Sequence, residues 1–243
     1  MPYRRLPNTD AARIRAMKKA LDKGKELPPH KMAYSAKTFV RLQKFLPLFE
    51  HNIRLQRLAV ASQNKKSKEY NEVSRKARIY LTHFIRVMNM AIYRGDMPPE
   101  TRAYFGLTTN ELTVPDINND KELITWSQRI IEGEGLRLRS GGSPITNPTI
   151  AVVKVRFENF IEEYNSQRIL AKKAFDFTER IADMRKEVDD IIRLIWNEVE
   201  ASLQHLPEEE KRTECEDYGL VYFFRKSELD KSLSGKIIDP VSS

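Results

Sequence analysis

One stretch of the sequence decides the fold: residues 177–203, FTERIADMRKEVDDIIRLIWNEVEASL. Apolar side chains recur there every three or four residues, from Phe177 and Ile181 to Val199 and Leu203, with charged residues between them. An α-helix brings residues at this spacing onto one face, and neither Gly nor Pro interrupts the pattern. The stretch therefore predicts a long helix that buries one stripe and exposes the remainder to solvent.

The same pattern returns at residues 70–91 and predicts a second long helix. The polar segment 64–68 precedes it and is expected to be the turn between two antiparallel helices. Pro47 lies inside an earlier helical pattern and is expected to kink or split that helix, because proline lacks the amide hydrogen and clashes one turn back. These features predict an all-α fold built on long antiparallel hairpins, with a short β element at residues 220–224.

The two halves of the sequence repeat each other. Caps, prolines and apolar positions recur at offsets of 110 and 111, and Phe105-Gly106-Leu107 recurs as Tyr218-Gly219-Leu220. The common order of these features predicts a tandem duplication. The expected divisions are a basic helical-bundle repeat at 1–107, a linker at 108–118, an acidic helical-bundle repeat at 119–226 and a flexible tail at 227–243.

The net charge of +8 is divided unevenly between these halves. Residues 1–110 carry 23 Lys or Arg against 8 Asp or Glu, whereas residues 111–243 carry 19 against 26. Such a division indicates either a polyanion-binding surface on the basic half or attraction between the halves, within one chain or between chains.

Two basic runs could form a polyanion-binding surface. One lies at residues 4–25, where Arg15, Lys18 and Lys19 share a connected helix face. The other crowds the predicted turn and the helix after it, and it supplies the candidate polyanion-binding residues, Lys65, Lys66, Lys68, Arg75, Lys76 and Arg78.

Side chains that could carry catalysis are present, but their patterns favour structural roles. The sequence lacks the Glu-x-x-His and His-Glu-x-x-His motifs of metal sites, a P-loop and a nucleotide-binding fingerprint. His83 lies beside the apolar stripe and is expected to be packed and hydrogen-bonded. Cys215 has acidic neighbours, which raise the pKa of a thiol, and is expected to be inert. We expect no enzyme activity, no metal and no cofactor.

Three further groups have competing interpretations. Gly141-Gly142 is expected to be a turn. The acidic residues could form an acid–base pair, but their helical spacing favours a solvated face; they are Glu158, Glu162, Glu163, Asp189 and Asp190. The aromatic and Met residues could line a ligand pocket, but the same spacing is more typical of core; they are Tyr80, Phe84, Met88, Met90 and Tyr93.

The N-terminal half also resembles a known family. Leu6-Pro7-x-Thr9-Asp10, a helix and a hairpin, then Tyr104-Phe105-Gly106-Leu107-Thr108 before Val114-Pro115-Asp116, is similar to a bacterial helical-bundle family whose function is not characterised. The resemblance covers about residues 4–116. Some members continue into β-sandwich modules, where this chain has its second repeat. The resemblance implies a bundle module and provides no functional residues to transfer.

Composition and patterning together predict a non-catalytic structural or protein–protein interaction module. The expected partner is a protein or a second copy of the chain. The alternative is polyanion or nucleic-acid binding through the basic N-terminal repeat, and an enzyme is the third hypothesis. One cysteine, no secretory h-region and no apolar run near 18 residues predict a cytoplasmic protein without a membrane span.

Overall fold

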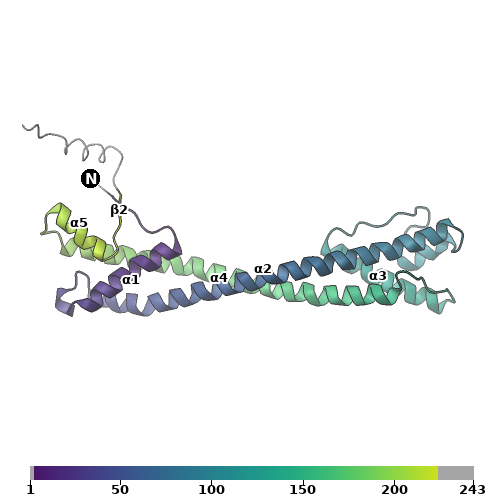
Figure 1. The fold of residues 1–243 in the computed structure, drawn as a ribbon, viewed down its shortest axis with the longest axis horizontal. Coiled ribbons are helices and arrows are strands. Elements are labelled where there is room, and N and C mark those ends of the chain that lie inside the picture. Colours follow the sequence, from purple (N-terminus) through teal and green to yellow (C-terminus); the bar gives the residue numbers. More distant parts are fainter. Residues whose placement is uncertain (1–2, 224–243) are drawn as a thin grey trace, which may run out of the picture. The chain divides into compact units, whose positions relative to one another are not determined.

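The computed structural model describes residues 3–223, which are mostly helical (Figure 1). Two short strands form an antiparallel pair, in which Tyr3 lies opposite Phe223 and Arg4 opposite Tyr222. In chain order the elements are β1 (Tyr3–Arg4), α1 (Asp10–Glu26), the 3₁₀ helix η1 (Pro29–Lys31), α2 (Ala36–Tyr93), the 3₁₀ helix η2 (Pro99–Phe105), α3 (Asp120–Arg139), α4 (Ile150–Ser202), α5 (Glu208–Asp217) and β2 (Tyr222–Phe223).

The two longest helices are uninterrupted, which corrects the expected hairpins. The predicted turn at residues 64–68 is wrong, because α2 continues through it for 58 residues. This segment contains neither Gly nor Pro, and its three Lys residues lose little side-chain freedom in a helix. Similarly, α4 is one helix of 53 residues. The antiparallel packing is therefore between α2 and α4, and each half contributes one long helix to it.

Pro47 does not split α2. It is exposed, so a carbonyl that loses its helical hydrogen bond at this position faces water and can be solvated. Polar side chains cap the starts of α1 and α3. Thr9 caps α1 by accepting a hydrogen bond from the Ala12 amide at 3.2 Å, and Asn119 caps α3 by accepting one from the Glu122 amide at 2.9 Å.

The chain forms two compact units. Unit 1 comprises Met1–Arg57 and Asp176–Ser243, and unit 2 comprises Leu58–Phe175. Each unit therefore contains parts of both expected repeats, and the unit boundaries fall inside α2 and α4. These boundaries differ from the division at residues 107–119 that the sequence led us to expect.

Unit 1 packs α1, the first part of α2, the last part of α4 and α5 around one core. Trp196 and Phe49 are among its fully buried side chains. The Tyr34 hydroxyl donates to the Ala20 carbonyl at 2.7 Å, and its ring meets the Tyr218 ring edge-on at 5.9 Å between centroids. The connection after α1 and the segment after α5 are thus joined through the core.

Unit 2 packs α3 and η2 against the second part of α2 and the first part of α4. The Phe84 and Phe105 rings meet edge-on at 6.2 Å between centroids. A Cβ atom at Gly133 would lie 2.5 Å from the Tyr104 carbonyl oxygen. Glycine at this position therefore allows α3 to cross η2 closely.

The predicted β element is present in part. Of its described residues, only Tyr222 and Phe223 form the strand β2, which pairs with β1 in unit 1. Phe224 and the expected tail at 227–243 lie outside the described residues.

Candidate functional site

The six candidate polyanion-binding residues all lie on α2 in unit 2, and the structure divides them into two groups. Three form ion pairs within the unit. The Lys66 ammonium lies 2.7 Å from a Glu163 carboxylate oxygen, and Lys76 lies 2.7 Å from Glu72. The carboxylate of Glu163 raises the pKa of Lys66 through this hydrogen bond.

Arg78 completes the paired group. Its guanidinium donates to Asp120 at 2.8 Å and to the Ile117 carbonyl at 2.9 Å. Asp120 is the first residue of α3, so this contact fixes the start of that helix against α2. Lys66 and Arg78 therefore join α2 to α4 and α3, whereas the Lys76 pair lies within α2.

The remaining three candidates, Lys65, Lys68 and Arg75, are exposed. Within residues 3–223, no ion pair joins them to another side chain. Their spacing places them on one face of α2, because residues three, seven and ten apart lie within about 100° of arc on a helix. This half of the predicted set forms an open cationic surface.

Apolar side chains extend the same face of α2. Ile79 is 49% exposed, Met90 54% and Tyr93 79%, and Arg86 lies between them. We define the α2 stripe as these exposed residues of one helix face: Lys65, Lys68, Arg75, Ile79, Arg86, Met90 and Tyr93.

The expectation that Met90 and Tyr93 are core is wrong. The buried positions in this part of α2 include Leu81, Phe84 and Met88, and residues 90 and 93 fall outside that pattern. The signal in the sequence was their position, which falls outside the stripe formed by Leu81, Phe84 and Met88.

A shallow groove of about 450 Å³ lies at one end of the α2 stripe. Arg86, Met90 and Tyr93 line it from α2, and Leu112 and Val114 line it from the segment that follows η2. The Asn89 amide donates to the Leu112 carbonyl at 3.1 Å and holds the two walls together. Residues 108–118, expected as a linker, thus contribute to a surface in unit 2.

A buried arginine anchors this segment. Arg102 is fully buried and donates to the Asn89 side chain and to the carbonyls of Thr108 and Thr113. Burial lowers the pKa of its guanidinium. These acceptors are all neutral, and they compensate for the loss of water around the charge. Arg102 therefore anchors, from the interior of unit 2, the segment that forms one wall of the groove.

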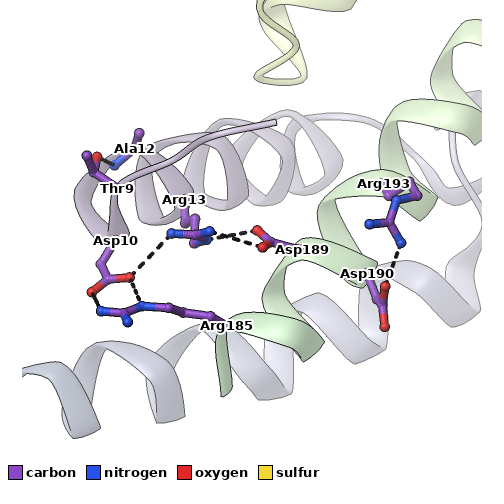
Figure 2. A network of polar contacts seen from close by, with 8 residues as sticks. All are labelled: Thr9, Asp10, Ala12, Arg13, Arg185, Asp189, Asp190 and Arg193. Atoms are coloured by element: carbon purple, nitrogen blue, oxygen red, sulfur yellow. Dashed lines mark hydrogen bonds and ion pairs between the residues drawn. The ribbon is translucent and has the colours of Figure 1, made fainter. Parts of the chain in front are cut away.

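In unit 1, acidic and basic residues from the two halves form a network between α1 and α4 (Figure 2). Arg185 donates two hydrogen bonds to Asp10, both of 2.8 Å, and Arg13 donates two to Asp189, of 2.8 and 3.0 Å. Arg13 also lies 3.6 Å from Asp10. The hydrogen bonds from Arg185 are the main reason that the pKa of Asp10 is lowered.

Ion pairs of this kind bring basic residues of the first half next to acidic residues of the second half. Unit 1 carries 24 Lys or Arg and 21 Asp or Glu, a net of +3, and unit 2 carries 18 against 13, a net of +5. The strong asymmetry along the sequence therefore becomes a mild one in space. The pairs that join a base of residues 1–110 to an acid of residues 111–243 include Arg4–Glu200, Arg13–Asp189, Lys23–Asp217, Arg41–Glu187, Lys66–Glu163 and Arg78–Asp120.

The other candidates for chemistry have varied environments. His83 is exposed, so the expected packed histidine is wrong; the adjacent Phe84 faces the core instead. Cys215 is buried, and burial, more than its acidic neighbours, raises the pKa of its thiol. Gly141 forms the expected turn, with φ of +88°. Over the described part of the chain, no group of three His, Cys, Asp or Glu residues could hold a metal ion.

No family model, curated protein or solved structure matches this chain. The helical character implied by the resemblance to the bacterial bundle family is confirmed, whereas membership of that family stays a prediction. None of the helices between residues 3 and 223 is long and apolar enough to cross a membrane.

Proposed function

We propose that the chain is a non-catalytic protein–protein interaction module, and that the α2 stripe binds an acidic, amphipathic segment of another protein. One observation carries this proposal: exposed apolar side chains and unpaired cations share one face of α2. Tyr, Met and Arg are enriched at protein interfaces, and Tyr93, Met90 and Arg86 lie together at the groove. Carboxylates of a partner would face the cations while its apolar side chains entered the groove.

Polyanion binding is the second candidate, and the unpaired Lys65, Lys68 and Arg75 favour it. A phosphate backbone is bound by cations and does not require Ile79, Met90 or Tyr93 to be exposed. Ion pairing inside each unit also leaves less of the basic half available to phosphates than its sequence suggests. These points make an acidic protein segment the better fit.

The test compares three peptides and a DNA duplex by fluorescence anisotropy across a salt series. The first peptide is an 18-residue amphipathic helix with Leu on one face and Glu on the other. The second has Gln in place of Glu, and the third has the composition of the first in scrambled order. We expect the first peptide to bind at least ten-fold more tightly than either control, and more tightly than a 20-base-pair duplex.

Two sets of protein variants separate the two candidates. Replacing Lys65, Lys68 and Arg75 with Glu should weaken binding of the first peptide at least ten-fold. The double substitution Met90→Ser with Tyr93→Ser should weaken its binding by a similar factor. The matched control is Lys172→Glu with Lys173→Glu, exposed cations on α4 of the same unit.

Duplex binding that responds only to the charge variant would establish the polyanion alternative. If neither the first peptide nor the duplex binds more tightly than the Gln and scrambled peptides, the proposed site is refuted. Self-association in sedimentation experiments, abolished by both variants, would replace the separate protein with a second copy as the partner.

We also propose that the two halves arose by tandem duplication. The helices α1 and α3 each begin one residue after a side-chain cap. A glycine with positive φ comes directly after η2, at Gly106, and two residues after the end of α5, at Gly219. Unit 1 joins α1 of the first half to α5 of the second, and unit 2 joins α3 of the second half to η2 of the first. The two units therefore have the same kinds of parts, exchanged reciprocally between the halves.

Burial in the long helices supports the duplication and favours one offset, 111. An offset of 110 pairs Phe84 with the exposed Leu194, whereas an offset of 111 pairs it with the buried Ile195. With an offset of 111 the buried pairs are Leu42 with Val153, Phe49 with Phe160, Ala77 with Val188, Leu81 with Ile192, Phe84 with Ile195, Ile85 with Trp196 and Met88 with Val199.

The equivalent substitutions Phe84→Ala and Ile195→Ala test this proposal. Each should increase amide hydrogen exchange chiefly in its own unit, by similar factors at positions 111 residues apart. Exchange that rises at unrelated positions in the two variants would contradict the duplication.

A further inference from the structure

Unit 1 contains a cavity of about 400 Å³ that is distinct from the α2 stripe. It lies between the start of α1 and the segments that flank it, residues 5–8 and 219–223. Leu6, Leu220 and Phe223 are among its apolar lining residues. A volume of this size is within the range of small-molecule binding sites.

The close approach of Gly219 to α1 shapes one wall of this cavity. Gly219 has φ of +86°, and a Cβ atom there would lie 2.6 Å from the Ala16 carbonyl oxygen of α1. The Arg5 amide donates to the Val221 carbonyl at 3.3 Å and holds the two flanking segments together. The walls are therefore backbone segments fixed by packing and hydrogen bonds.

Three cations line the cavity. Arg15 and Lys19 are four residues apart and so lie on the same face of α1, and Arg5 lies on the segment before that helix. The Lys19 ammonium donates to the Glu216 carbonyl at 3.2 Å, which keeps its charge near the cavity. None of the residues that line the cavity is Asp or Glu, and no other described side chain forms an ion pair with these three cations.

We infer that this cavity binds a small organic anion with an apolar body, such as a free aliphatic or aryl carboxylate. The apolar lining would receive the body of the ligand, and the cations would bind its head group. A neutral ligand would leave three like charges uncompensated, and a cationic ligand would be repelled. An anionic lipid in a bilayer has the same chemistry, so the experiment must separate the two sources.

The test follows amide chemical shifts of the full chain on addition of octanoate, 1-octanol or octylammonium, each below its micelle-forming concentration. We expect saturable shifts with octanoate that are concentrated at residues 5–19 and 216–223. The alcohol should bind at least ten-fold more weakly, and the ammonium should not bind. Vesicles of phosphatidylglycerol form the separate membrane arm.

The double substitution Arg15→Gln with Lys19→Gln should weaken octanoate binding at least ten-fold, because it removes two charges from the cavity. Both positions are exposed, and Gln retains much of the side-chain length. The matched control, Lys37→Gln with Lys44→Gln, removes two exposed cations from α2 in the same unit and should leave binding unchanged.

Equal affinity for octanoate and octanol would overturn the inference, because the cations would then have no role. Shifts scattered over the chain, or equal losses in the variant and the control, would also overturn it. Binding to vesicles without binding to octanoate would refute a site for a free acid. These outcomes do not depend on the α2 stripe, so they are independent of the proposed function.

Discussion

The ion-pair network between α1 and α4 gives the sharpest prediction, through Asp10→Asn (Figure 2). The Asp10 side chain is only 19% exposed and accepts two hydrogen bonds of 2.8 Å from Arg185. Hydrogen bonds to charged groups contribute about 1.5–3 kcal/mol, and a carboxylate in the first turn of a helix adds about 0.3–1 kcal/mol through the helix dipole.

Two features reduce that sum for the substitution. Asparagine can still accept one hydrogen bond, and Arg185 is 39% exposed, so water can solvate the cation that remains. We therefore expect Asp10→Asn to lower the free energy of unfolding by about 2 kcal/mol at pH 7, less than the ~3–5 kcal/mol expected on breaking a fully buried pair. Urea unfolding measures this difference.

The pH dependence provides an independent check. Because the folded state lowers the pKa of Asp10, its contribution is complete above the ordinary pKa of Asp, about 4, and is lost as pH falls through the lower folded value. The gap between the native chain and Asp10→Asn should therefore narrow as pH falls below the ordinary pKa of Asp, because protonation removes the charge that Asn also lacks.

Asp22→Asn is the matched control, since Asp22 is exposed on the same helix. It should change the free energy of unfolding by less than about 0.5 kcal/mol. A gap for Asp10→Asn no larger than that of the control, or one that persists unchanged at pH 2, would refute the reasoning.

Three further predictions concern buried or constrained positions. Phe84→Asp and Ile191→Asp each place a carboxylate at a fully buried position and should lower the free energy of unfolding by several kcal/mol; normal thermal melts would contradict this. Gly219→Ala should destabilise by about 1–2 kcal/mol more than Gly141→Ala in urea unfolding, because both glycines have positive φ but a Cβ meets backbone only at Gly219. Arg102→Ala should lower the free energy of unfolding by about 3 kcal/mol and increase amide exchange at residues 107–117, since three acceptors lose their donor; unchanged exchange there would show that the anchor is unimportant.

Local patterns predicted the helices well where one face is buried. Residues 177–202 of the apolar stripe lie in α4, and Thr9 and Asn119, which are of types favoured at N-caps, cap α1 and α3. Helix caps depend on short-range hydrogen bonds, and burial repeats with the helical period, so both are visible in sequence.

Long-range arrangement was not predictable in the same way. The segment 64–68 is polar like a turn, but three of its five residues are Lys, a good helix former, so composition could not decide between the two. Whether Pro47 is exposed depends on how its helix packs, which the local sequence does not specify. Likewise, nothing in sequence spacing brings Arg5 next to Arg15 and Lys19, because β1 must first pair with β2 at the far end of the described chain.

The discontinuity of unit 1 has a consequence for synthesis on the ribosome. All residues of unit 2 have been made once residue 175 is added, whereas unit 1 also needs residues from Asp176 onward. Until those residues emerge, Met17 and Leu21 on α1 lack the α4 and α5 surfaces that bury them. Translation therefore creates an interval in which α1 presents apolar surface, and chaperones that bind such surface would act on α1 before residues 176 onward exist.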